Sequence, residues 1–217
     1  DGTNGTELWK SDGTASGTVM VKDIKSGGNG DSAPSHLTVV GNTLFFFAGD
    51  GINGGELWKS DGTASGTVMV KDINSGSTGS TPRQLTTVGS TLYFSAWDST
   101  NGRELWKSDG TTSGTVMVKD IKIGSNSGIS IYAPSSASLG NTLYFQADDG
   151  THGYELWKSD GTTSGTVMVK DIRIGSGSSD LAYLRAVGNT LYFVADDGAN
   201  GLELWTNRWV YTEVTYA

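Results

Sequence analysis

Short stretches of alternating apolar and polar residues recur along the chain, and Gly-rich turns separate them. In one of these stretches Leu92, Phe94 and Ala96 fall on one face of a strand, and the residues between them fall on the other. Before it stands Gly89-Ser90, a two-residue turn with Gly first, which is typical of a type II′ hairpin. The four strands expected in this unit are 85–88, 91–96, 104–107 and 115–121.

This unit is repeated. Glu-Leu-Trp begins at Glu7, Glu56, Glu104, Glu155 and Glu203, so successive starts are 49, 48, 51 and 48 residues apart. The first four copies read Glu-Leu-Trp-Lys-Ser-Asp-Gly-Thr, whereas the last continues with 206–208, Thr-Asn-Arg. A fixed period of this length indicates a repeat architecture in which neighbouring units bury each other's apolar surfaces.

The repeated octapeptide resembles the ELWxxDGT repeat family, which occurs in large secreted or surface proteins of bacteria. The resemblance covers nearly the whole chain and ends at Trp205. It implies a β-propeller-like fold and brings no established activity with it.

The apolar pattern also predicts a β-propeller, an all-β fold of four-stranded antiparallel blades with about 48 residues per repeat. Apolar side chains on both faces of the second and fourth strands indicate a sheet packed between two others. The single repeat domain, 1–217, divides into a half blade at 1–24, full blades at 37–73, 85–121 and 137–172, and a modified blade at 184–217.

Two closures of the ring are open. In the first, five blades form a ring in which one blade is incomplete, and the chain length favours this arrangement. In the second, the N-terminal half blade completes the hairpin at 184–195, which gives four blades and leaves 203–217 over. Unpaired strand edges are also expected to recruit other copies of the chain.

The composition argues against several classes of function. The net charge of −8 and the lack of a basic stripe argue against nucleic-acid binding, and no apolar run is long enough for a membrane span. The absence of cysteine excludes disulfides and cysteine chemistry. Because the chain begins inside a repeat, we expect that a signal segment was removed or that the chain is part of a longer protein.

A repeated Asp-loop-Glu pattern is the candidate metal site. Two carboxylates with loop carbonyls supply several of the six to eight oxygens that calcium prefers. The alternative is structural, with the Asp capping a turn. The residues are Asp50 and Glu56, Asp98 and Glu104, Asp149 and Glu155, and Asp197 and Glu203.

Aromatic and variable residues are the candidate ligand contacts. The tryptophans of the repeated motif are expected in the core between blades, and the Ser-Asp-Gly-Thr segment is expected to be a structural turn. Trp97 differs because it stands beside a loop, where Gly49, Asp148 and Asp196 stand in the other units. The candidate contacts are Trp97, Arg103, His152, Tyr154, Tyr132 and Arg83, which vary between otherwise similar copies.

No catalytic motif stands out, so the sequence predicts a non-enzymatic, extracellular or cell-surface module for binding or adhesion, with glycans as the ligand and calcium as the candidate ion. Several equivalent weak sites on one rigid body would gain avidity. The alternative is a structural repeat protein that assembles into oligomers or filaments through its blade edges.

Overall fold

The computed structural model describes residues 3–27, 30–131 and 136–207, and all regular elements in these ranges are β-strands. The first ten strands are β1 (Leu8–Lys10), β2 (Val19–Lys22), β3 (Ser35–Val40), β4 (Thr43–Gly49), β5 (Gly55–Ser60), β6 (Val68–Lys71), β7 (Arg83–Val88), β8 (Thr91–Asp98), β9 (Gly102–Ser108) and β10 (Val116–Lys119). The others are β11 (Ser136–Leu139), β12 (Thr142–Asp148), β13 (Tyr154–Ser159), β14 (Val167–Lys170), β15 (Ala182–Val187), β16 (Thr190–Asp196) and β17 (Leu202–Thr206).

The strands pair in chain order into five antiparallel sheets. Strands β3–β6, β7–β10 and β11–β14 form four-stranded sheets, β1–β2 a two-stranded sheet, and β15–β17 a three-stranded sheet. The all-β class and the four-stranded antiparallel sheets are therefore confirmed. The fourth strand expected at 209–216 lies outside the described residues.

Turn chemistry explains the short connections. The hairpin glycines Gly41, Gly89, Gly140 and Gly188 all have φ between 58° and 60°, a conformation that Gly adopts without a Cβ clash. In the Ser-Asp-Gly-Thr turn, Asp109 Oδ1 accepts hydrogen bonds from the backbone N–H (2.8 Å) and the hydroxyl (2.7 Å) of Thr111. The same bonds recur in the other three copies, which confirms that this segment is a structural turn.

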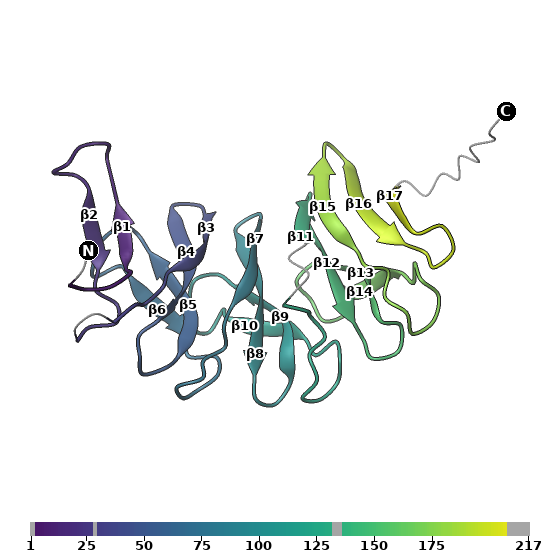
Figure 1. Cartoon of the computed structure of the whole chain (residues 1–217), viewed down its shortest axis with the longest axis horizontal. Coiled ribbons are helices and arrows are strands. Elements are labelled where there is room, and N and C mark those ends of the chain that lie inside the picture. The colour runs from purple at the N-terminus through teal and green to yellow at the C-terminus, as the bar shows by residue number, and fades with distance from the viewer. Residues whose placement is uncertain (1–2, 28–29, 132–135, 208–217) are drawn as a thin grey trace.

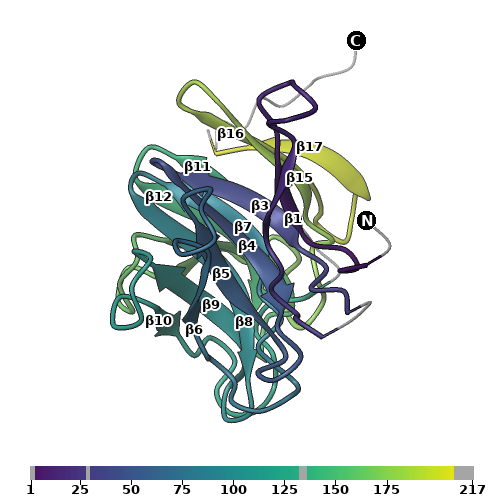
Figure 2. The same cartoon turned by 90° about the vertical axis from the view of Figure 1, so that its left-hand side faces the viewer.

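The sheets follow one another along the molecule, so that the half sheet β1–β2 and strand β17 lie at opposite ends (Figure 1). Seen from the β1 end, the sheets stand one behind another (Figure 2). The first strands of successive four-stranded and three-stranded sheets are in contact, β3 with β7, β7 with β11, and β11 with β15. We call these four the inner strands, because they gather on one side of the stack.

Apolar side chains fill the space between sheets. Phe45, Leu57 and Val70 of one sheet form a buried cluster with Leu92 and Phe94 of the next. Equivalent clusters lie at the other three junctions. Each of the three four-stranded sheets therefore buries apolar side chains on both faces, as the apolar pattern predicted, because neighbouring sheets exclude water from each other.

Lysine side chains also donate hydrogen bonds across these junctions. Lys59 Nζ donates to Gly110 O in the next sheet at 2.8 Å, and Lys71 Nζ donates to Thr115 O at 2.8 Å. Lys71 Nζ also lies 5.7 Å from the centre of the Trp106 ring, a distance suited to a cation–π interaction. The core role expected for the motif tryptophans is confirmed for Trp58, Trp106 and Trp157, which are buried, whereas Trp9 is exposed.

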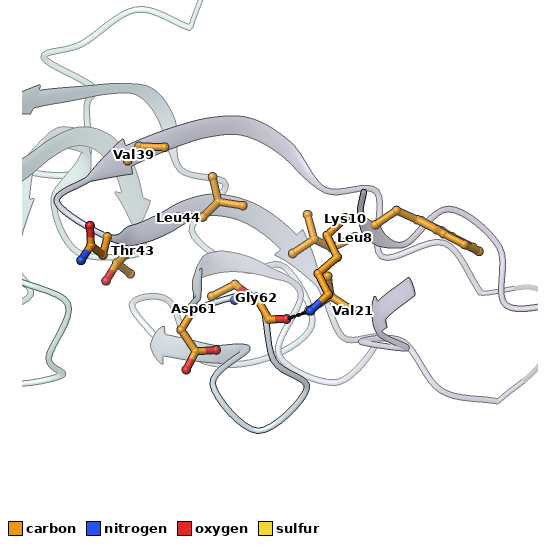
Figure 3. A pocket seen from close by; sticks show the side chains of 11 residues that line it. Leu8, Lys10, Val21, Val39, Thr43, Leu44, Asp61 and Gly62 are labelled. Atoms are coloured by element: carbon orange, nitrogen blue, oxygen red, sulfur yellow. Dashed lines mark hydrogen bonds between the residues drawn. The ribbon is translucent and has the colours of Figure 1, made fainter. Parts of the chain in front are cut away.

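The half sheet leaves a groove beside it. Leu8 and Val21 form one wall, and Val39 and Leu44 of the next sheet form the other (Figure 3). In the full sheets, the first two strands occupy the corresponding place. The described residues contain no helix of the length and apolarity that a membrane crossing requires.

Candidate functional site

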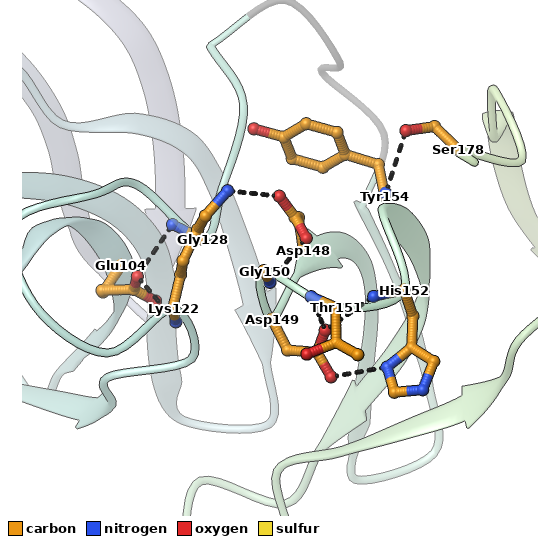
Figure 4. Close-up of polar contacts among 10 residues, drawn as sticks. All are labelled: Glu104, Lys122, Gly128, Asp148, Asp149, Gly150, Thr151, His152, Tyr154 and Ser178. Atoms are coloured by element: carbon orange, nitrogen blue, oxygen red, sulfur yellow. Dashed lines mark hydrogen bonds and ion pairs between the residues drawn. The ribbon is translucent and has the colours of Figure 1, made fainter. Parts of the chain in front are cut away.

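The carboxylates of the predicted calcium loops have separate structural partners. Glu104 is fully buried and accepts hydrogen bonds from the backbone N–H groups of Ile121 (3.0 Å), Lys122 (3.3 Å) and Gly128 (2.8 Å) (Figure 4). These donors lie in the segment that crosses to the next sheet. Glu104 therefore fastens its sheet to the crossing segment.

Glu7, Glu56 and Glu155 make the same kind of contact. Each accepts backbone N–H groups of its own crossing segment, and Glu56 also accepts the hydroxyl of Ser80. Burial raises the pKa of Glu104 to about 7 and raises the pKa values of Glu56 and Glu155, against the opposing effect of their hydrogen bonds. Glu203 differs from all of them because it is exposed.

The aspartates of these loops cap turns instead. Asp98 Oδ1 accepts the backbone N–H groups of Thr100 and Asn101, each at 2.8 Å. Equivalent bonds reach Asp50, Asp149 and Asp197. Across the described parts of the chain, no group of three or more His, Cys, Asp or Glu residues is arranged to hold a metal ion. These aspartates therefore have the geometry of the structural alternative, in which Asp caps a turn.

Arg103 is buried, contrary to the prediction that it contacts a ligand. Its Nη1 donates to the backbone oxygens of Thr81 (2.9 Å) and Ser95 (3.3 Å). Burial lowers its pKa to about 10, and the charge of Arg83 adds to this effect. Arg103 thus joins its strand to the crossing segment before it. Trp97 stands opposite Arg103 in the β8–β9 ladder and is partly buried.

His152 lies in the loop before β13, and Tyr154 is the first residue of β13 (Figure 4). His152 Nδ1 is 2.9 Å from Asp149 Oδ2, and this contact raises the pKa of the imidazole. Nearby, Lys122 Nζ forms a 2.6 Å ion pair with Asp148. These side chains stabilise the loop by pairing with each other. Tyr132, the remaining candidate besides Arg83, lies outside the described residues.

Arg83 lines a groove on the inner strands, and we call this the inner groove. It has a volume of about 290 Å³. Its walls come from β3, β7 and the crossing segment before β11, through His36, Leu37, Thr38, Arg83, Gln84, Leu85 and Ile131. Of these residues, the sequence pointed only to Arg83.

Two bulges shape the inner groove. His36 and Gln84 occupy the same repeat position and have φ values of 57° and 56°. The β3–β4 and β7–β8 ladders both shift register at this point. Tyr183, at the same position of β15 and outside the groove, has φ 57° and a similar register shift, so the bulge is a feature of the repeat. A left-handed backbone at a non-Gly residue costs on the order of 1–3 kcal/mol. No Gly marks these positions in the sequence, so turn signals could not reveal them.

The groove combines polar and apolar groups. Burial lowers the pKa of His36, and the positive charge of Arg83 lowers it further, so the imidazole is neutral at pH 7. Gln84 Nε2 donates to Ser130 O at 3.1 Å, which ties β7 to the segment before β11. With exposed Leu37 and Ile131 beside the Arg83 guanidinium, the arrangement offers hydrogen-bond donors next to apolar surface.

Comparison with known proteins identifies the fold only. No family model and no curated protein matches the chain. Among solved structures, two of puromycin hydrolase are similar over 88% of this chain, at 14% identity and TM-scores of 0.56 and 0.55. A prolyl endopeptidase structure is similar over 91% of the chain, at 14% identity and a TM-score of 0.50. The chain spans less than a third of each of these proteins, between 28% and 29%.

These similarities correct one prediction. The sequence predicted a non-enzymatic protein because no catalytic motif stood out. The similar structures are those of hydrolytic enzymes that carry the same propeller-like all-β fold. This fold therefore occurs within enzymes, and the lack of a recognisable motif gave no sound reason to exclude that class.

Proposed function

We propose that this chain is a β-propeller-type binding module whose ligand occupies the inner groove. The observation that carries the proposal is the meeting of His36, Arg83 and Gln84, from two successive sheets, beside exposed Leu37 and Ile131. Binding sites are typically concave and mostly apolar, with a few polar groups that set orientation. Two strained bulges hold these groups on rigid strands.

Glycans are the ligand class that we propose. A sugar ring presents hydroxyl groups at its edge and C–H groups on its faces. The guanidinium of Arg83 and the amide of Gln84 are suited to the hydroxyl groups, because both are planar donors. Leu37, Leu85 and Ile131 are suited to the apolar faces. The proposal therefore has one main binding site, in the inner groove, and not several equivalent sites on the repeats.

The test is a glycan-binding measurement with the whole chain, followed by titration calorimetry on the glycans that bind. Arg83→Ala is expected to weaken binding roughly tenfold or more, because a charge-assisted hydrogen bond is lost. Arg185→Ala is the matched control, since Arg185 lies on inner strand β15 and does not line the groove. Adding and chelating Ca²⁺ in the same assay tests the proposed ion.

Two outcomes would contradict the proposal. In the first, no glycan binds the folded chain with or without Ca²⁺. In the second, a glycan binds but Arg83→Ala and Arg185→Ala leave its affinity equally unchanged, which would place the site elsewhere.

We further propose that the chain belongs to the ELWxxDGT-repeat proteins and acts outside the cell or at its surface. The four nearly identical copies of the motif support this assignment. The contacts among β3, β7, β11 and β15 support blades arranged around a common axis. Detection of the chain in the secreted or surface fraction of its source organism is the corresponding test.

A further inference from the structure

The sheet β7–β10 departs from the sheet β3–β6 at three repeat positions that lie close together. At these positions Arg83, Ser95 and Arg103 stand where the other sheet has Ser35, Phe47 and Gly55. The Phe47 ring fills the space beside Gly55, where an added Cβ would lie 2.2 Å from a ring carbon. Arg103 is only 5% exposed, and its Nη1 donates to Ser95 O at 3.3 Å. The sheet β7–β10 therefore buries a positive charge where the sheet β3–β6 buries a phenyl ring.

The buried guanidinium of Arg103 has neutral hydrogen-bond partners. Its acceptors are backbone oxygens and hydroxyl groups of Ser80, Thr81 and Ser95. None of the ion pairs found in the described ranges includes it. A buried charge is usually paired with an opposite charge, because removal from water is costly. Arg103 therefore leaves a positive charge without a carboxylate counterpart in the described structure.

Arg83 brings a second positive charge to the same place. It stands opposite Ser95 in the β7–β8 ladder, and Ser95 is the residue that Arg103 contacts. The Arg83 side chain lines the inner groove, and its guanidinium makes no hydrogen bond or ion pair with any residue of 3–27, 30–131 or 136–207. Residues 132–135, which follow the groove residue Ile131, are Tyr-Ala-Pro-Ser and include no acidic side chain. Two arginines thus share one site in a chain of net charge −8.

We infer that the ligand of the inner groove is an acidic glycan whose oxyanion binds the Arg83 guanidinium. This inference rests on the proposed function and names the class of glycan that the groove takes. The carboxylate of a uronic acid and a sulfate ester share this chemistry, since each accepts two parallel hydrogen bonds from a guanidinium. The bound anion supplies the countercharge for Arg83, and Arg103 strengthens the attraction from within the sheet.

The other groove residues suit the uncharged parts of an acidic sugar. Burial lowers the pKa of His36, and the charge of Arg83 lowers it further, so the neutral imidazole can both donate to and accept from ring hydroxyl groups. Leu37 and Ile131 are exposed and offer apolar surface to the C–H groups of the ring. The positive charge available to the ligand therefore comes from the arginines.

A glycan array that carries acidic sugars beside their neutral counterparts tests this inference with the whole chain. Its pairs are oligomers of galacturonic acid and of galactose, oligomers of glucuronic acid and of glucose, and sulfated and unsulfated galactose oligomers. For the glycans that bind, titration calorimetry is expected to show roughly tenfold or tighter binding of the acidic member. The preference should shrink as NaCl is raised, because salt screens charges. The uronic and sulfated pairs distinguish the two sources of the anion.

Substitution of Arg83 then assigns the preference to the inner groove. Arg83→Gln removes the charge and keeps a planar donor, so it should bring the affinities for acidic and neutral members close together. Arg83→Lys keeps the charge and should retain part of the preference. Arg185→Gln is the control, because it makes the same change in net charge on β15, outside the groove. It should leave the preference unchanged.

Three outcomes are decisive against the inference. Binding of the neutral members that equals or exceeds binding of the acidic members would overturn it and leave the proposed glycan-binding function standing. An acidic preference that Arg83→Gln and Arg185→Gln reduce equally would also overturn it, since net charge alone would then explain the preference. A chain that binds no glycan on the array would overturn the proposed function itself, and the inference with it.

Discussion

Replacing Glu104 by alanine is expected to lower the free energy of unfolding by about 3 kcal/mol or more, because buried donors lose their shared acceptor. The Glu104 carboxylate is fully buried and accepts backbone N–H groups of Ile121, Lys122 and Gly128. With alanine, all three donors face a cavity. Chemical denaturation and the melting temperature measure the loss.

Glu203→Ala is the matched control for this prediction. Glu203 occupies the same place in the Glu-Leu-Trp motif and is exposed. A solvated carboxylate leaves no buried group unsatisfied when it is removed, so we expect little change in stability. Equal losses for Glu104→Ala and Glu203→Ala would show that the buried hydrogen bonds contribute no special stability.

Stability is expected to fall as the pH rises from about 4.5 to about 7. Burial raises the pKa of Glu104 to about 7, from a usual value of 4.5. The folded chain therefore binds more protons than the unfolded chain in this window, and the free energy of unfolding decreases with pH. The shift corresponds to a loss on the order of 3 kcal/mol from Glu104. Glu56 and Glu155 add to the loss in the same direction.

Melting temperatures across this pH range measure the effect. Glu104→Gln removes one titrating group, so the decline should become shallower while the contributions of Glu56 and Glu155 remain. A melting temperature that rises from pH 5 to pH 7, or an unchanged slope in Glu104→Gln, would contradict this assignment.

The sequence predicted the sheets well because their signals are local. The apolar residues Leu92, Phe94 and Ala96 are buried in β8 as expected, and the hairpin glycines form the turns. Identical copies then implied identical sheets. The Ser-Asp-Gly-Thr turn was also predictable, since Asp and Thr bond to backbone only a few residues away.

The site was harder to predict because its parts are distant in the chain. His36 and Arg83 meet only after two sheets have packed together. Arg103 varies between copies, as a ligand contact would, but its side chain turns inward to Thr81 O and Ser95 O. The repeated Glu suggested metal binding. In the structure its carboxylate instead accepts hydrogen bonds from backbone N–H groups of a crossing segment some 17 to 24 residues later. Sequence spacing does not reveal such pairings.

A designed disulfide between inner strands tests most directly whether the first strands of successive sheets meet along one side of the stack. Thr86 on β7 and Ser136 on β11 have side-chain oxygens 2.6 Å apart. We predict that Thr86→Cys with Ser136→Cys forms an internal disulfide under mild oxidation in a folded protein. Two free thiols in the oxidised, folded variant would contradict it, because the inner strands would then not converge.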